Sequence, residues 1–125
     1  MKLATLSHIP WPENNLDPQT LMENACAEVV LAENLGFDSA WFAEHHFSRY
    51  GLGSSSLMVL SHIAAITKTI ELGTAVLLPT LHNPIKLAED TATLDVLSQG
   101  RLNVGFGRGT EGYEYHGYMV DWEES

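Results

Sequence analysis

The sequence predicts an α/β protein built on parallel strands. Short apolar runs recur roughly every thirty-odd residues, which is the period of a strand followed by a crossover helix. The segments between the runs carry helix start and stop signals, so strand and helix alternate strictly along the chain. The runs at residues 3–6 and 70–78 are too continuously apolar for an antiparallel sheet with one wet face. Together these features favour parallel strands joined by right-handed crossovers.

Each of the four predicted strands ends in a polar or glycine-rich cluster. The apolar runs occupy residues 3–7, 41–43, 70–78 and 102–106. They are followed by His8, by Glu44-His45-His46, by Pro79 and by Gly107-Arg108-Gly109. Because parallel strands bring their carboxyl ends to one edge of a sheet, we expect these clusters to meet in one place.

Three helices are predicted between the strands, and two of them have clear ends. Asp17-Pro18 places a good N-cap before a proline at the first helical position, and Gly36 ends that helix. Asn83-Pro84 repeats the arrangement, with Gly100 as the stop. The serines at 54–56 offer a cap for the middle helix, whose apolar positions are less sharply one-sided.

Two architectures satisfy this alternation: an open doubly wound sheet and a closed eight-stranded barrel. A complete barrel typically needs about 250 residues, whereas this chain has 125 residues and about four strand–helix units. In the barrel interpretation, residues 1–125 are the amino-terminal half of one domain that is incomplete at its carboxyl end. Residues 113–125 agree with this, because they are acidic and aromatic with no helix stop and no return strand.

The composition is that of an ordinary globular protein, with 45% hydrophobic and 18% charged residues. A net charge of −10 argues against nucleic-acid binding and gives no attraction to anionic membranes. Cys26 is the single cysteine, so no internal disulfide is predicted. The amino terminus lacks the pattern of a signal peptide, and no uncharged stretch is long and apolar enough to span a bilayer. A cytoplasmic protein is the default expectation.

His45 and His46 are adjacent imidazoles just past a strand, so their side chains should point in different directions. Either one can face a pocket at the strand ends and act as a general base near neutral pH, and position alone does not choose between them. A metal site is the rival interpretation, with Glu44 and both histidines joined by a further histidine. The sequence offers no H-x-H and no H-E-x-x-H, so no metal is predicted.

The glycine-rich run at residues 107–112 formally matches G-x-G-x-x-G, a dinucleotide-binding fingerprint. A real fingerprint follows the first strand of its unit and opens a helix with an apolar face, whereas residues 113–117 are a poor helix start. The dinucleotide interpretation is therefore rejected. Arg108 can still bind a phosphate, because flanking glycines let backbone N–H groups approach and the guanidinium makes bidentate contacts. The alternative is a surface salt bridge between Arg108 and the acidic tail.

Three segments together resemble the luciferase-like flavin monooxygenases. They are residues 41–47 (WFAEHHF), 73–84 (GTAVLLPTLHNP) and 97–109 (LSQGRLNVGFGRG), which occur in the family's order and spacing. The resemblance covers essentially the whole chain. It implies a (β/α)8 TIM barrel, of which this chain is about the first four βα units, with reduced FMN bound at the carboxyl ends of the strands.

The resemblance also assigns roles to individual residues. By motif match, His45 is the catalytic histidine beside the flavin, and Glu44 lies near the isoalloxazine through its backbone. Arg108 is the ligand of the FMN phosphate, assisted by Thr110. A cis non-proline peptide against the flavin ring is expected between Ala75 and Val76.

The implied activity is oxygenation of a small organic substrate, such as an aldehyde, ketone or sulfonate, by O2 and reduced FMN from a separate flavin reductase. Gly107 stands where the light-emitting catalytic subunit has a reactive cysteine, which favours a general monooxygenase over light emission. Two alternatives stay open: an F420-dependent hydride-transfer enzyme of the same fold, and a non-catalytic partner subunit. The resemblance further suggests a dimer, and the isolated chain is expected to be inactive because half a barrel exposes two strand edges.

Overall fold

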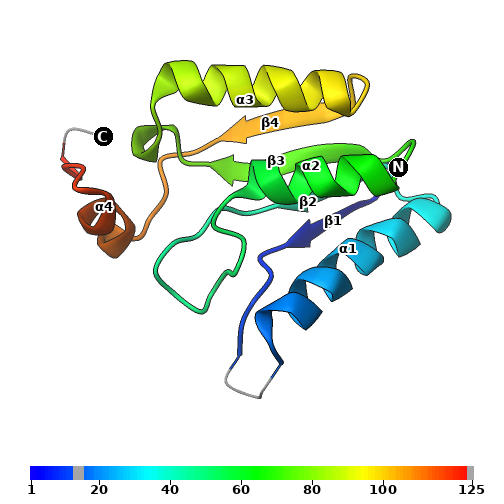
Figure 1. Cartoon of the computed structure of the whole chain (residues 1–125), viewed down its shortest axis with the longest axis horizontal. Coiled ribbons are helices and arrows are strands. Elements are labelled where there is room, and N and C mark those ends of the chain that lie inside the picture. The colour runs from blue at the N-terminus through cyan, green and yellow to red at the C-terminus, as the bar shows by residue number, and fades with distance from the viewer. Residues whose placement is uncertain (13–15, 124–125) are drawn as a thin grey trace.

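The computed structural model describes residues 1–12 and 16–123, and the last two residues of the predicted acidic tail lie outside this part of the chain. Four strands and four α-helices follow one another in the predicted alternation (Figure 1). The strands are β1 (Ala4–Ser7), β2 (Ser39–Phe42), β3 (Glu71–Leu77) and β4 (Leu102–Phe106). The helices are α1 (Pro18–Asn34), α2 (Ser56–Ile66), α3 (Pro84–Leu97) and α4 (Gly112–Tyr118), with a short 3-10 helix η1 (Pro79–Leu81) after β3.

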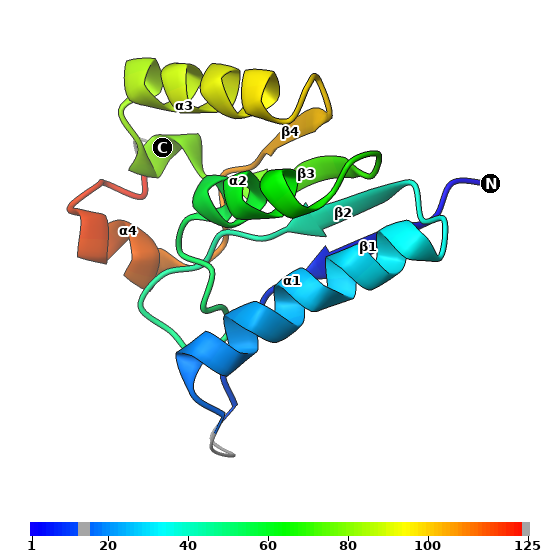
Figure 2. The same ribbon diagram turned by 45° about the vertical axis from the view of Figure 1, so that its right-hand side comes forward.

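The sheet is parallel throughout, and its spatial order is β1-β2-β3-β4. In a doubly wound sheet the strand order reverses at a switch point, whereas barrel strands follow one another in sequence. One hydrophobic core joins the sheet to α1, α2 and α3, so these three helices cover the same face (Figure 2). Sequential order and one-sided helices therefore select the barrel over the doubly wound sheet.

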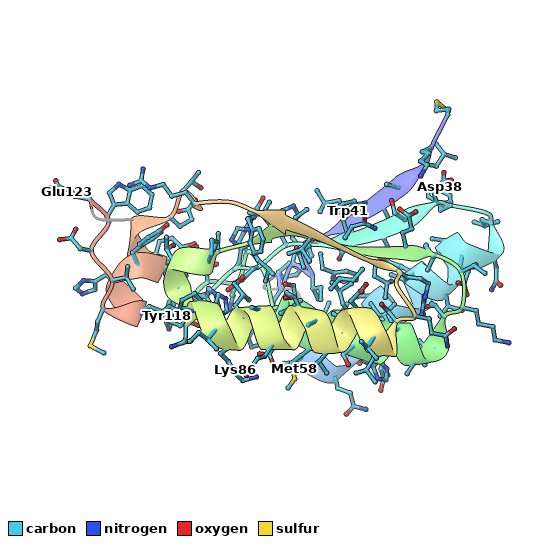
Figure 3. The ribbon with its side chains drawn as sticks, turned by 90° about the horizontal axis from the view of Figure 1, so that it is seen from above. Asp38, Trp41, Met58, Lys86, Tyr118 and Glu123 are labelled. Atoms are coloured by element: carbon cyan, nitrogen blue, oxygen red, sulfur yellow. The ribbon has the colours of Figure 1, made fainter. Side chains whose placement is uncertain are left out.

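The opposite face of the sheet carries side chains that the helices do not cover. Leu6, Trp41 and Gly73 lie side by side in the strand register. Leu6 is 57% exposed there, and Figure 3 shows Trp41 on the side of the sheet away from α3. A Cβ atom on Gly73 would lie 2.2 Å from the Trp41 ring, so the indole packs directly over the glycine. In a barrel the face opposite the helices is the interior layer.

The helix ends confirm the predicted caps in two cases of three. The Asp17 side chain accepts a 3.0 Å hydrogen bond from the Thr20 amide, and Asn83 accepts from the two amides that follow Pro84. Gly36 and Gly100 both adopt positive φ just past their helices, at 80° and 79°. The serine cap of α2 was predicted wrongly, because Ser55 occupies the N-cap position without a side-chain hydrogen bond.

The segment after β4 corrects a second expectation. Residues 113–117 were predicted as a poor helix start without a stop, yet Gly112–Tyr118 forms the seven-residue helix α4. Met119 ends this helix in the left-handed conformation, with φ at 58°. Glu114 and Tyr115 are each 1% exposed, so part of the predicted acidic surface tail is buried. The burial of these two side chains stabilises a helix that local propensity does not favour.

Two charged side chains join elements at the amino-terminal edge of the sheet. Arg101 donates to carbonyl oxygens at the end of α2 and just before β3, including Ala64 at 2.9 Å and Ile70 at 3.1 Å. One oxygen of Glu33, on α1, accepts the three consecutive amides of residues 68–70 at 2.7–3.0 Å. Burial alone would raise the pKa of Glu33, but the hydrogen bonds outweigh it and lower that pKa to about 2.

Within the described residues, no helix combines the length and apolar character needed to cross a bilayer.

Replacing Glu33 with Gln should lower the free energy of unfolding of the whole protein by roughly 1 kcal/mol at neutral pH, because a neutral acceptor binds the amides less strongly. The folded-state pKa lies below the ordinary value of 4.5. The contribution is therefore present above about pH 4.5 and fades as the pH falls toward 2. Denaturant midpoints measured from pH 7 to pH 3 should show the gap between wild type and Glu33→Gln closing.

The matched control is Glu28→Gln, which changes an exposed carboxyl on the same helix. It should leave the midpoint and its pH dependence unchanged. A Glu33→Gln gap that stays constant down to pH 3 would contradict the role given to the carboxylate.

Candidate functional site

The candidate site lies at the carboxyl ends of the strands, where the loops after β2, β3 and β4 meet α4 (Figure 1). At the end of β3, the peptide bond between Ala75 and Val76 is cis, as the resemblance predicts. It falls within the irregular stretch between Thr74 and Leu77, where the register of β3 against β4 shifts. The site is therefore built where regular strand pairing ends.

Glu44 is the centre of a buried hydrogen-bond network. Its carboxylate is held by His46 Nε2 at 2.8 Å and by His82 Nε2 at 2.7 Å. The Leu78 amide donates to the second carboxylate oxygen at 3.0 Å. Glu44 is only 2% exposed. One carboxylate thus joins the end of β2 to the loop that carries η1.

Burial opposes ionisation of Glu44 and on its own would raise its pKa. The hydrogen bonds from His46, Leu78 and His82, together with the charge on His82, act in the opposite direction and prevail. The pKa of Glu44 therefore lies below the ordinary glutamate value, and the side chain is a carboxylate at neutral pH.

The Glu44 carboxylate also determines which nitrogen of the neutral His46 ring carries the hydrogen. A carboxylate only accepts hydrogen bonds, so the neutral ring carries its hydrogen on Nε2. Its Nδ1 then accepts from the Tyr118 hydroxyl at 3.1 Å. Burial, followed by the negative charges of Glu44 and Glu114, raises the pKa of Tyr118, which keeps that hydroxyl protonated. Both ring nitrogens of His46 are engaged and the residue is 4% exposed, so its role is structural.

His45 points elsewhere, as expected for the neighbour of His46. Its Nδ1 lies 3.3 Å from Glu114 Oε1, and its side chain is 19% exposed. The ring is stacked against His8 at a centroid distance of 5.5 Å and meets the edge of Tyr50 at 4.7 Å. No described residue makes a hydrogen bond to His45 Nε2. Of the two histidines, His45 is the one with a nitrogen left for chemistry.

A hollow of about 410 Å³ lies beside His45. The loop from 47 to 54 and Trp11 form its other walls. Gly51 permits the loop to approach this closely, because a Cβ atom there would lie 2.9 Å from the His8 carbonyl oxygen and 3.0 Å from His45 Cβ. The hollow therefore depends on a glycine in the loop after β2.

The end of β4 packs closely against the cis peptide. A Cβ atom on Gly107 would lie 2.4 Å from Val76 Cγ2. On Gly105 it would lie 2.4 Å from the Thr74 carbonyl oxygen. Gly109 has a φ of 82°, which a residue with a side chain rarely adopts. This glycine-rich segment brings the backbone around Arg108 next to the end of β3.

Arg108 is exposed and contacts the residues that follow α4. Its guanidinium donates to the Trp122 carbonyl at 2.6 Å and lies 4.3 Å from the centre of the Trp122 ring. The Tyr115 hydroxyl donates to the Arg108 carbonyl. Thr110 is exposed nearby, and its hydroxyl donates to Glu111 at 3.4 Å. The guanidinium can reach a phosphate, which would compete with the Trp122 contact.

In residues 1–12 and 16–123, no group of three or more His, Cys, Asp or Glu side chains is placed to hold a metal ion. Cys26 is partly exposed on α1, and burial raises the pKa of its thiol. A raised pKa makes the thiolate scarcer and does not suit a nucleophile.

Three contributors to the site escaped prediction: Glu114, Tyr118 and Tyr50. Glu114 and Tyr118 are four residues apart, so one face of α4 presents both side chains to the histidines. That spacing was the available signal. The spacing was not recognised, because the segment was predicted to be an acidic tail without a helix.

The family model described as luciferase-like monooxygenase matches residues 4–125. The chain belongs to this family. Among curated relatives of the luciferase-like chain, the alkanal monooxygenase alpha chain of Aliivibrio fischeri is 37% identical over 101 residues, covering 80% of this chain and 28% of that protein. The chain spans only about 30% of the length of the curated relatives it matches.

Solved structures agree on the fold. The monooxygenase RslO1 from Streptomyces bottropensis superposes with a TM-score of 0.94 at 33% identity, covering all of this luciferase-like chain and 38% of that one. The coenzyme F420 dependent tetrahydromethanopterin reductase from Methanopyrus kandleri gives a TM-score of 0.68 at 26% identity, over 96% of this chain and 30% of that one. The α/β fold class predicted from sequence is confirmed: the chain forms a parallel four-stranded sheet and superposes on part of a luciferase-like barrel.

Replacing Glu44 with Gln should lower the free energy of unfolding of the whole protein by about 2–3 kcal/mol. The carboxamide keeps one acceptor oxygen but turns an NH2 donor toward groups that are themselves donors. Denaturant titration at pH 7 measures the effect. The control is Glu89→Gln, an exposed position on α3 that should change stability by less than about 0.5 kcal/mol. Equal midpoints for the two variants would contradict the network.

Proposed function

We propose that the whole protein is a flavin-dependent monooxygenase that uses reduced FMN and O2 to oxygenate a small organic substrate, and that this chain supplies the first four βα units of its barrel. The observation that carries the proposal is the position of the His45 side chain and the contact that its ring makes. Its Nδ1 faces a buried carboxylate, and its side chain lines a hollow at the strand ends. Active sites of TIM-barrel enzymes lie at that end of the barrel.

The residues at the strand ends fit FMN. A flat ring system suits the apolar end of β3, where Ala75 and Val76 are half-buried and β4 comes close through its glycines. Arg108 offers an exposed guanidinium for the phosphate, and Thr110 offers an exposed hydroxyl beside it. The Glu44 side chain is already occupied in its network, so its contribution to the ring comes from its backbone.

Bound flavin would supply the redox chemistry, and the protein residues would supply position and proton transfer. His45 lines the hollow, and a ring nitrogen that the network leaves unbonded could take up a proton. His46, Glu44 and His82 fix the backbone that carries His45, because each of their contacts is buried or half-buried. These positions favour a general base of fixed orientation over a mobile one.

We further propose the partners of this reaction. Reduced flavin would come from a separate flavin reductase, as the family resemblance implies. The whole protein would act as a dimer on its organic substrate and O2.

The second candidate is F420-dependent hydride transfer. The likeness to the tetrahydromethanopterin reductase favours it, because the same four units occur in that F420-dependent enzyme. F420 also carries a phosphate, so Arg108 serves both candidates. Oxygen incorporation separates them, since hydride transfer adds no oxygen atom to the substrate.

Replacing His45 with Ala in the whole protein should lower the oxygenation rate by about 10²–10⁴-fold, the usual contribution of a positioned general base. The affinity for reduced FMN should change little. The measurement uses ¹⁸O2 with small aldehydes, ketones and sulfonates, and follows one labelled atom into the product by mass spectrometry.

The matched control is His62→Ala, an exposed histidine on α2, which should leave the rate unchanged. Full activity in His45→Ala would remove the catalytic role of His45. A reduced substrate that contains no ¹⁸O would assign the protein to hydride transfer.

A further inference from the structure

We propose that Glu114 is the positioning residue of His45: its carboxylate fixes the imidazole as the Nδ1–H tautomer, so that Nε2 is the nitrogen that takes up a proton in the hollow. This inference rests on the proposed function for its catalytic meaning.

The first support is the burial and contact geometry of Glu114. The residue is 1% exposed, and one oxygen accepts from the His46 amide at 2.8 Å and lies 3.3 Å from His45 Nδ1. The amide hydrogen bond fixes that oxygen in place. A fixed carboxylate oxygen accepts but does not donate, so the facing ring nitrogen carries hydrogen.

The second support is the contrast with the adjacent ring. In His46 the Glu44 carboxylate faces Nε2, and the Tyr118 hydroxyl donates to Nδ1. In His45 the carboxylate faces Nδ1. The two neighbours are therefore held in opposite tautomers by two different buried glutamates. That arrangement directs the basic nitrogen of His46 toward a tyrosine and leaves the basic nitrogen of His45 outside the network.

The third support is the way α4 is anchored. Phe47 packs over Gly117, where a Cβ atom would lie 2.2 Å from its ring. Tyr115, the residue next to Glu114, accepts from Thr80 at 3.0 Å and donates to the Arg108 carbonyl. Two consecutive residues of α4 therefore hold His45 and the backbone of Arg108. The helix sets the relative position of the base and the phosphate ligand.

The proton path follows from this geometry. When Nε2 takes a proton from a group in the hollow, the ring becomes an imidazolium whose Nδ1–H still faces Glu114. The proton does not pass on to Glu114, and the carboxylate balances the new positive charge. Release of the proton from Nε2 restores the neutral Nδ1–H form.

The test reads the tautomer directly in the cofactor-free whole protein. Long-range ¹H–¹⁵N correlation spectra of protein with ¹⁵N-labelled histidine, recorded near pH 8 where imidazoles are neutral, distinguish Nδ1–H from Nε2–H. His45→Gln identifies the His45 signals by their loss. We expect Nδ1–H for His45 and Nε2–H for His46 in the wild type. Nε2–H for His45 would overturn the proposal without any variant.

Two variants then isolate the carboxylate. Glu114→Met removes the acceptor and should move His45 mainly to the Nε2–H form, which free imidazole side chains favour. Glu114→Gln keeps an acceptor oxygen without the charge and should give a mixture of both forms. Glu111→Met, at the start of the same helix, is the matched control and should leave the spectrum unchanged. A His45 ring that stays Nδ1–H in folded Glu114→Met would overturn the proposal.

The catalytic consequence is measured separately. Glu114→Gln should lower the oxygenation rate by at least about tenfold, a part of the general-base contribution, while the dissociation constant of reduced FMN stays within about twofold. A protein that shows the expected tautomers but neither binds flavin nor oxygenates substrates would refute the proposed function and leave the assignment of Glu114 standing. Unchanged turnover in a Glu114→Gln protein with shifted tautomers would overturn the positioning role.

Discussion

The Glu44 carboxylate joins the loops after β2 and β3 into one rigid unit. Three donors from these two loops converge on it inside the protein, two of them histidine rings. A buried charge is costly unless it is fully hydrogen-bonded, and here every donor depends on the others being in place. The network holds the chain just after β3, at Leu78 and His82, against the loop after β2.

A second layer of constraint comes from α4. Glu114 reaches the histidines across sixty-nine residues of sequence, and Tyr118 reaches His46 across seventy-two. The network around Glu44 fixes the backbone that carries His45, and α4 fixes the orientation of the His45 ring. The site is thus assembled from loops of three strands and one short helix. Its chemistry depends on long-range contacts more than on any single motif.

Local signals allowed the sequence to predict much of this structure. Asp17 and Asn83 cap their helices with side chains that bond amides two or three residues away, so the pattern contains the whole interaction. The strands follow from continuous apolar runs, and the cis peptide and His45 came from the family resemblance. Glu114 could not be predicted in the same way. Its role arises from contacts with a distant loop, and composition around it favours a solvated tail.

At the start of α2, by contrast, the sequence predicted a capping interaction that does not form. Three serines in a row satisfy the composition of a cap, yet Ser56 is 1% exposed and Ser55 makes no capping bond. Packing of α2 against the sheet outweighs the local preference there. Composition indicates which residues are able to cap, and the tertiary contacts decide which ones do.

The most direct measurement is an anaerobic titration of the whole protein with reduced FMN, reduced F420 and reduced riboflavin, repeated for Arg108→Ala. We expect FMN to bind more tightly than F420, and Arg108→Ala to weaken FMN binding by about 10- to 100-fold, the value of a charge-assisted contact. Riboflavin, which lacks the phosphate, should bind wild type and variant equally. Preference for F420, or equal loss of FMN and riboflavin binding in the variant, would contradict the proposed flavin site.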